Sequence, residues 1–127
     1  MIEEWALTNE GTNFRVKAKC WGWDGKEWIW NVYVYVYEQH PLFPQIQDQL
    51  AAEAVFNEKM NGGITLYKKH EKCVELGDDS SHIWCEHLKR YGPRDMPYEV
   101  KEEWLMLTEY MEGFYKDDSK TDQQIQE

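Results

Sequence analysis

The chain has 127 residues, of which 24 are acidic and 14 basic, so its formal net charge is −10. Its hydrophobic fraction is 42% and its aromatic fraction 15%, with seven Trp and eight Tyr, which excludes the composition of a disordered chain and indicates one folded domain. The excess of acids also argues against a general nucleic-acid binder, because contacts to phosphate need clustered Lys and Arg side chains.

The strongest secondary-structure signal is residues 28–37, in which β-branched and aromatic residues occupy every position except Asn31. This run predicts a long strand. Because successive side chains of a strand point to opposite faces, one face holds two Trp and three Val and is predicted to be core. The other face carries hydroxyl groups, and we expect Tyr33, Tyr35 and Tyr37 there to contact solvent or a partner.

The preceding segment, residues 12–21, alternates in the same way and predicts the partner strand of a hairpin. A two-residue turn would place its basic side chains beside the Trp and Val face of the long strand. A three-residue loop with a bulge at Gly25 avoids this mismatch, because it pairs Cys20 with Trp28. In that register the basic side chains share the hydroxyl-bearing face, with Arg15 paired with Tyr33, Lys17 with Asn31 and Lys19 with Ile29, which predicts a solvent- or partner-facing surface with cation–π character.

A middle helix and two short strands are predicted next. Residues 45–59 hold apolar side chains at near-helical spacing, which indicates an amphipathic helix. An Asn-Gly-Gly sequence ends it. Residues 64–69 and 72–76 are then predicted as two strands joined by a turn.

A polar loop precedes the last predicted helix. Asp95 is a candidate N-cap, Pro97 fits the first turn, and apolar side chains at helical spacing predict a helix that ends near Gly113. We expect residues 116–127 to form a polar, disordered tail. The remaining chain, residues 1–115, is predicted to be a single α+β domain in which an antiparallel sheet of about four strands packs against the C-terminal helix and the shorter middle helix.

The three cysteines are odd in number and lack a Cys-x-x-Cys spacing, which indicates reduced thiols rather than a disulfide framework. Two Cys and two His would satisfy tetrahedral zinc, but their spacing matches no standard zinc motif. We therefore expect no metal and no cofactor. The four residues of this rejected zinc site are Cys73, His82, Cys85 and His87.

Several classes of protein are excluded by the motifs that the sequence lacks. No segment reaches the roughly 18 to 20 apolar residues of a membrane span, and the N-terminus lacks the pattern of a signal peptide, so we expect a cytoplasmic protein. There is no P-loop, GxGxxG, HExxH, GxSxG or EF-hand loop. The sequence thus carries no signature of a known enzyme.

Polar side chains gather where several predicted strands begin or end. If neighbouring strands follow chain order and run antiparallel, the end of the long strand, the start of the third strand and the end of the fourth lie at one edge of the sheet. This predicts a polar site that combines His40, Asn61, Gly62, Gly63, Thr65, Asp79 and His82.

These residues have structural and chemical interpretations. The ring of His40 can hydrogen-bond a backbone group and fix the exit from the long strand, and Asp79 can accept backbone N–H groups in an Asx-turn. The glycines can supply a positive φ between helix and strand. The chemical hypothesis is that Asp79 orients His82, which forms an acid–base pair or a weak divalent-metal site with His40.

The same motifs resemble a group of small uncharacterised phage and prophage proteins. That group's pattern is His-Pro-Leu-aromatic, then His-Gly-Gly-Leu-Thr, then Gly-Phe-Asp-Cys-Ala-His-x-Gly-Asp, followed by a helix. The resemblance covers residues 30–111 and places His40, Pro41, Leu42, Gly62, Gly63, Thr65, Gly77, Asp79 and His82 on motif positions.

The chain departs from that pattern at several positions. Asn61 stands where the pattern has His, Asp78 where it has Phe, and Ser80 and Ser81 where it has Cys-Ala, while the Gly-Asp after the last His is absent. A catalytic role that required those residues could not operate here. The family has no established activity, so the resemblance implies a phage or mobile-element origin and a setting in the host cytosol.

Two functions are compatible with these observations. The first is a non-catalytic accessory protein that binds a host or phage protein, for example as an inhibitor of host defence. Its candidate surfaces are the tyrosine face and the acidic face of the last helix, with Glu102, Glu103 and Glu109. The alternative is a small enzyme, or a module that binds a ligand or a metal, built on His40, Asp79 and His82.

Overall fold

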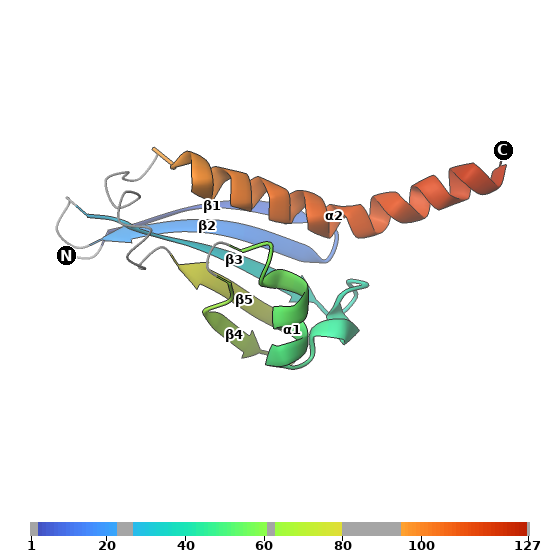
Figure 1. Ribbon diagram of the computed structural model, residues 1–127, viewed down its shortest axis with the longest axis horizontal. Helices are drawn as coiled ribbons and strands as arrows, with labels where there is room; N and C mark the ends of the chain where they lie inside the picture. Colours follow the sequence, from blue (N-terminus) through green and yellow to red (C-terminus); the bar gives the residue numbers. More distant parts are fainter. Residues whose placement is uncertain (1–2, 23–26, 61–62, 80–94, 127) are drawn as a thin grey trace.

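The computed structural model describes residues 3–22, 27–60, 63–79 and 95–126, with the backbone alone at Glu3, Asp79 and residues 116–126. Within these ranges the chain forms five strands, one 3₁₀ helix and two α-helices (Figure 1). In chain order they are β1 (Glu3–Gly11), β2 (Phe14–Gly22), β3 (Ile29–Tyr37), η1 (Phe43–Ile46), α1 (Gln49–Phe56), β4 (Leu66–Lys69), β5 (Cys73–Asp79) and α2 (Tyr98–Gln126).

The strands form a single sheet in the order β1-β2-β3-β5-β4, and every neighbouring pair is antiparallel. This confirms the predicted α+β fold with an antiparallel sheet, a C-terminal helix and a shorter middle helix. The sheet has one strand more than predicted, because β1 precedes the predicted hairpin.

β1 is the strand that was missed, and its sequence explains both its structure and the omission. Trp5, Leu7 and Asn9 alternate toward the helix side, but acidic residues at both ends weaken the pattern. A tight turn connects it to β2: Gly11 pairs with Phe14, and Asn13 adopts a positive φ of 62°, which Asn tolerates better than most residues.

The predicted register of β2 and β3 is wrong by two residues. Cys20 pairs with Trp30 rather than with Trp28, and Lys17 pairs with Tyr33 rather than with Asn31. β2 continues to Gly22, so the connection is longer than three residues, and the predicted bulge at Gly25 lies outside the described residues. A shift of two leaves every side chain on its predicted face, because side chains alternate with a period of two.

The order of the last two strands differs from chain order. β5 pairs with β3 on one side and with β4 on the other, so β4 is an edge strand. The side chains explain this placement. Val74 and Leu76 of β5 are fully buried, whereas Lys68 and Lys69 of β4 are exposed, and charged side chains are typical of sheet edges.

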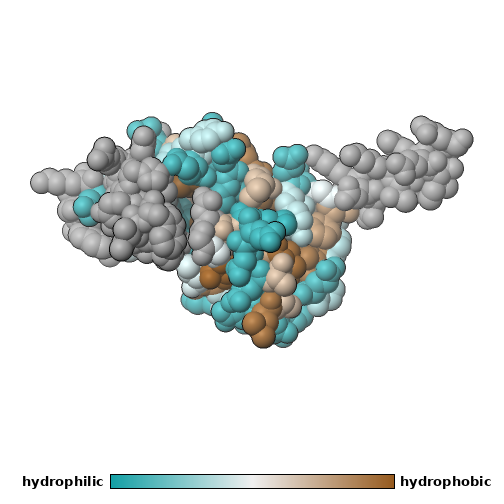
Figure 2. Space-filling model, in the orientation of Figure 1, coloured by the Kyte–Doolittle hydropathy of each residue, from teal (hydrophilic) through white to brown (hydrophobic). Residues whose placement is uncertain are grey.

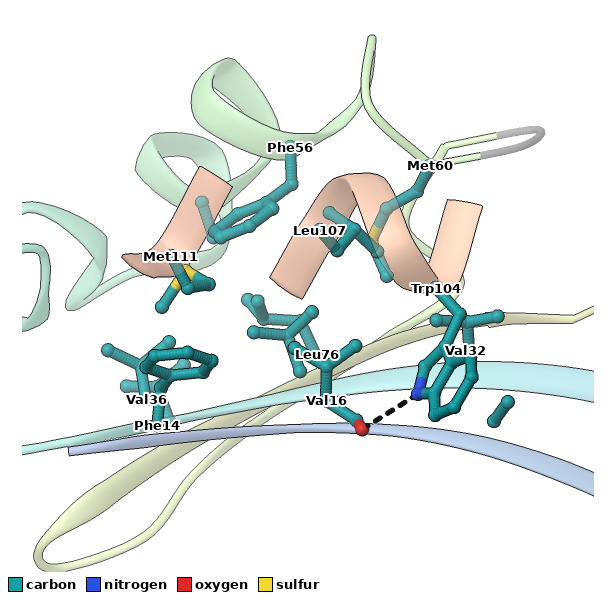
Figure 3. Packing of buried hydrophobic residues seen from close by; sticks show 14 of the residues in the cluster. Phe14, Val16, Val32, Val36, Phe56, Met60, Leu76, Trp104, Leu107 and Met111 are labelled. Atoms are coloured by element: carbon teal, nitrogen blue, oxygen red, sulfur yellow. Dashed lines mark hydrogen bonds between the residues drawn. The ribbon is translucent and has the colours of Figure 1, made fainter. Parts of the chain in front are cut away.

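Both α-helices pack on one face of the sheet (Figure 3). In α2, Leu107 and Met111 are fully buried, and the indole Nε1 of Trp104 donates a hydrogen bond of 3.0 Å to the carbonyl oxygen of Val16 in β2. In α1, Phe56 is fully buried and its ring meets that of Tyr110 edge to face at 6.0 Å. One core therefore joins the sheet and both helices.

The ends of the predicted helices need correction. The middle helix divides into η1 and α1, because the Asp48 side chain caps α1 by accepting from Ala51 N at 2.8 Å. Pro97, not Asp95, immediately precedes α2. The helix also continues past Gly113 to Gln126, since one helical Gly costs only about 1 kcal/mol and no Pro follows it.

The predicted tail, residues 116–127, is described by its backbone alone, up to residue 126. Residues 116–126 have a helical backbone, and in Figure 1 this end of α2 extends beyond the sheet. The division of the chain into a domain, residues 1–115, and a separate tail stays a prediction.

Candidate functional site

The predicted polar edge does not bring His40 together with Thr65 and Asp79, because these described members lie at opposite ends of the sheet. Glu38 N donates to Lys72 O at 3.1 Å, which places the exit of β3, and His40 after it, beside the start of β5. Thr65 N donates to Gly77 O at 2.8 Å, near the other end of β5. Five residue steps, from Lys72 to Gly77, separate these two points, or about 17 Å. The prediction assumed that strands pair in chain order, and the position of β5 between β3 and β4 overturns that assumption.

His40 has the structural role considered for it. The side chain is only 1% exposed. Its Nε2 lies 3.1 Å from the carbonyl oxygen of Met111, and its Nδ1 accepts a hydrogen bond of 3.0 Å from Leu42 N. The ring also meets those of Phe14 and Phe114 edge to face. Burial lowers the pKa of this histidine, although the bond to Met111 opposes the shift.

The other predicted site residues are placed only in part. Gly63 has a φ of +80°, which confirms that it supplies a left-handed conformation before β4. Thr65 is exposed, and its hydroxyl lies 3.5 Å from Gly77 O. The backbone of Asp79 pairs with Asn31. Asn61, Gly62 and His82 lie outside the described residues, so the pairing of Asp79 with His82 stays untested.

Metal and thiol chemistry find no support in the part of the chain that the structure describes. No group of three His, Cys, Asp or Glu side chains lies there in positions that could hold a metal ion. Burial raises the pKa of Cys20 to about 12 and also raises that of Cys73, so neither thiol is activated. Three of the four residues of the rejected zinc site, His82, Cys85 and His87, lie outside the described ranges.

The face of the sheet opposite the helices carries the functional candidate. We call it the open face and define it by the side chains of β2, β3 and β5 that alternate with the core residues. On β2 and β3 these side chains are all basic, aromatic, amide or aliphatic, and most are half-buried. The open face consists of Arg15, Lys17, Lys19, Trp21, Ile29, Asn31, Tyr33, Tyr35, Tyr37, Cys73 and Glu75, together with Gly77.

Lys17 lies at the centre of the open face. Its Nζ is 5.5 Å from the ring centroids of both Tyr33 and Tyr35, within the range of cation–π attraction. Unlike Lys17, the neighbouring basic side chains form ion pairs: Arg15 pairs with Glu10 at 2.8 Å and Lys19 with Glu4 at 3.1 Å. Among the described residues, Lys17 makes no ion pair.

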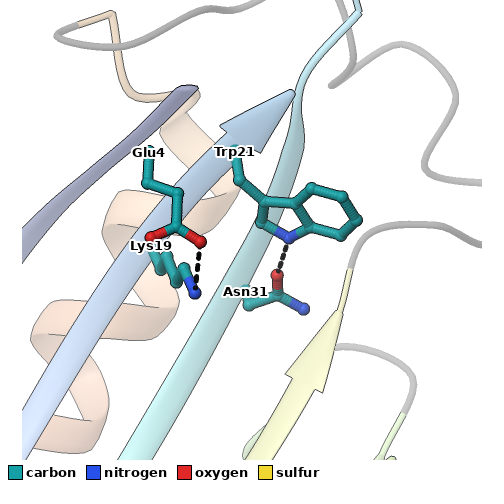
Figure 4. A network of polar contacts seen from close by, with 4 residues as sticks. All are labelled: Glu4, Lys19, Trp21 and Asn31. Carbon is teal, nitrogen blue, oxygen red and sulfur yellow. Dashed lines mark hydrogen bonds and ion pairs between the residues drawn. The ribbon is translucent and has the colours of Figure 1, made fainter. Parts of the chain in front are cut away.

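Polar contacts fix the surroundings of Lys17. Trp21 Nε1 donates to Asn31 Oδ1 at 2.7 Å, beside the pair of Lys19 and Glu4 (Figure 4). On the other side, Tyr35 hydrogen-bonds Glu75, and burial together with that carboxylate raises the pKa of Tyr35 to about 12. The tyrosine therefore stays a neutral hydroxyl at physiological pH.

Gly77 makes room for the tyrosine next to Lys17. A Cβ at Gly77 would lie 2.6 Å from Cδ1 of Tyr33 and 3.3 Å from the carbonyl oxygen of Val32. Only glycine thus lets the Tyr33 ring lie against β5. A shallow hollow opens on the β1 side of the lysine, lined by Glu4, Trp5, Ala6, Lys17 and Lys19.

The predicted acidic surface on α2 contains two of its three predicted glutamates. Glu102 and Glu109 are exposed, but Glu103 is only 5% exposed and is removed from that surface. Figure 2 shows the hydrophobic residues of the visible side as small areas among hydrophilic ones. The large hydrophobic side chains exposed in the described ranges are Leu7, Leu50, Tyr98, Leu105 and Met106.

The sequence placed Arg15, Lys17 and Lys19 on the same solvent- or partner-facing surface as the tyrosines, with cation–π character. The three tyrosines alone were named as candidate interaction residues of this surface. The observed register places Lys17 between two tyrosines, which the predicted register did not.

Comparison with protein families, with curated proteins and with solved structures finds no significant match to this chain. The likeness to phage proteins therefore rests on its short motifs alone. No helix in the described part of the chain is both long and apolar enough to cross a membrane.

Proposed function

We propose that this protein is a non-catalytic binding module, and that it holds a protein partner on the open face of its sheet. The observation that supports this most directly is the cluster of Lys17, Tyr33 and Tyr35. In this cluster the Lys17 ammonium lies near two aromatic rings and makes no ion pair with a described residue. The cluster lies on a face of the sheet that no described helix covers. Aromatic and basic side chains of this kind are enriched where proteins bind one another.

The chemistry of the cluster favours a partner with carboxylate groups beside apolar ones. A carboxylate can pair with Lys17 in the hollow that this lysine lines with Lys19. Apolar groups can pack on the rings of Tyr33 and Tyr35. The role of phage or prophage accessory protein, acting in the host cytosol, belongs to the same proposal and rests on the sequence motifs.

The experiment is affinity capture from a host lysate with matched charge-reversal variants. Lys17→Glu changes the centre of the open face, whereas Lys101→Glu makes the same change on exposed α2. We expect the wild type and Lys101→Glu to capture the same protein and Lys17→Glu to lose it, with all three showing similar thermal unfolding. Equal capture by both variants, or no capture by the wild type, would contradict the proposal.

A further inference from the structure

The free edge of β1 presents backbone hydrogen-bonding groups that no described residue uses. β1 is the first strand of the sheet, so β2 is the one strand paired with it in the described ranges. At nine residues, β1 is also more than twice as long as β4, the strand at the opposite edge, which has four. A long unpaired edge is a template for another strand.

The hydrogen-bond pattern of the sheet identifies which groups point outward. In antiparallel pairs, alternate residues exchange backbone hydrogen bonds with one neighbour and then with the other. Tyr37 N donates to Asn13 O at 3.1 Å in line with the β2–β3 register, so the odd-numbered residues of β2 bond β3 and the even-numbered ones bond β1. Since Ala18 pairs with Leu7, the odd-numbered residues of β1 bond β2. The outward N–H and C=O groups belong to Glu4, Ala6, Thr8 and Glu10.

We propose that β1 pairs with β1 of a second copy of this chain, antiparallel and about a two-fold axis. The register that uses the whole strand places Glu3 opposite Gly11 of the second copy. In this register Ala6 faces Thr8, so that outward groups meet outward groups, and Leu7 faces Leu7 at the axis. The result is a continuous sheet of twice the width, and the two open faces become one surface.

The side chains of β1 suit this pairing. On the helix side, Leu7 is 40% exposed and lines a hollow with Trp5, Met96 and Trp104 and with the charged Asp95 and Lys101. Contact between the two Leu7 side chains at the axis would bury apolar surface that the single chain leaves in water. On the open face, Ala6 and Thr8 are small enough to lie opposite each other without a clash.

Charge does not oppose a second copy at this edge, despite the net charge of −10. The pairing brings Glu4 of one copy opposite Glu10 of the other, and like charges in those positions repel. Each carboxylate is already paired within its own chain, Glu4 with Lys19 and Glu10 with Arg15. β1 and β2 together hold three acids and three bases, so the joined region is neutral while the acidic helix stays outside it.

The first test removes one outward donor. Thr8→Pro deletes an N–H that β2 does not use, and proline is tolerated at sheet edges. Lys69→Pro is the matched control at the opposite edge. His70 N donates to Cys73 O at 2.8 Å, so the N–H of Lys69 points away from β5.

Sedimentation of the full chain gives the measurement. We expect a reversible dimer whose dissociation constant rises at least about tenfold in Thr8→Pro and stays unchanged in Lys69→Pro. A wild type that stays monomeric at roughly 100 μM, where even weak specific pairs form, would overturn the proposal. So would equal effects of the two variants, or loss of the dimer in Lys69→Pro alone.

The second test reads the register by cross-linking. Leu7→Cys places two thiols at the axis, where a non-hydrogen-bonded pair has Cα atoms about 4.5 Å apart and a disulfide can close. Thr8→Cys is the control, because its Cα lies beyond about 7 Å from its own copy. We expect a covalent dimer above the wild-type background from Leu7→Cys alone. Equal cross-linking of both variants would refute this register.

Discussion

The two faces of the sheet are built from the same strands but follow different rules. On the covered face, Val16, Val34 and Val36 have no exposed surface, and their size and apolarity suit them to a close-packed core. On the open face, alternate positions of those strands hold lysine and tyrosine in mutual contact. Folding alone does not require lysine and tyrosine at these positions, because smaller polar side chains such as serine or threonine would be equally well hydrated on a solvent-facing sheet. The covered face therefore supplies stability, and the proposed binding function concerns the open face.

The largest effect is expected on the covered face. Trp104→Ala removes a buried indole and leaves the carbonyl of Val16 without its side-chain donor, so the free energy of unfolding should fall by about 3–5 kcal/mol. Denaturant unfolding followed by circular dichroism measures this. Leu105→Ala is the control: its side chain is 46% exposed and should change stability by no more than about 0.5 kcal/mol. Equal losses would remove the distinction between the buried and outer sides of α2.

The next effect tests the contact between β5 and the open face. Gly77→Ala forces its new methyl group against the Tyr33 ring, and we expect a loss of about 1–3 kcal/mol in unfolding free energy. Gly113→Ala is the opposite case, because nothing lies within 4 Å of its added Cβ and the residue is helical, so we expect a gain of about 0.5–1 kcal/mol. Thermal unfolding of both variants measures the contrast. A neutral Gly77→Ala would show that the ring is free to move.

A smaller, pH-dependent effect is expected at His40, which lies at the end of the covered face. Because the folded pKa lies below the ordinary value of 6.5, the unfolded chain takes up the proton first. The histidine's contribution to stability is complete above pH 6.5 and declines as the pH falls through that value toward the folded pKa. Unfolding free energies measured between about pH 5 and 8 should show this slope in the wild type and less of it in His40→Gln. An equal slope in both would assign it to other groups.

The smallest effect on folding is expected at the centre of the open face. Lys17→Gln removes the cation from Tyr33 and Tyr35, and an exposed contact of this kind contributes no more than about 1 kcal/mol. Lys101→Gln on α2 is the reference for loss of an exposed lysine. Chemical unfolding of the two variants should give nearly equal midpoints. A loss of several kcal/mol in Lys17→Gln would make the open face a structural element and remove the contrast between the faces.

The sequence was sufficient to predict which face of the sheet each side chain of β2 and β3 occupies, because this depends only on side-chain alternation. The faces of β2 and β3 are as expected, because an error of two residues in register preserves them. The register itself depended on where β2 turns, and the strand continues to Gly22. The polar edge failed for another reason. Alternation does not determine which strands are neighbours, and the burial of Val74 and Leu76 placed β5 between β3 and β4.

Among the candidate residues, the sequence singled out His40 but not the contacts of its ring, and it did not single out Lys17. His40 was singled out for its position after a strand, but its two ring nitrogens are engaged by the backbone at Met111 and Leu42, contacts that follow from tertiary structure. Lys17 carried no motif. Its importance arises from its proximity to Tyr33 and Tyr35, which depends on the exact register.

The position of α2 after all five strands in chain order has a consequence for biosynthesis. Its ties to the sheet join distant residues: Trp104 reaches Val16 across 88 positions, and Thr108 reaches Asn9 across 99. Because the ribosome makes α2 after the strands, the first three strands emerge with their apolar face uncovered, the kind of transient surface to which chaperones bind. The nascent protein is therefore prone to aggregation until α2 is synthesised, and the docking of α2 ends that period.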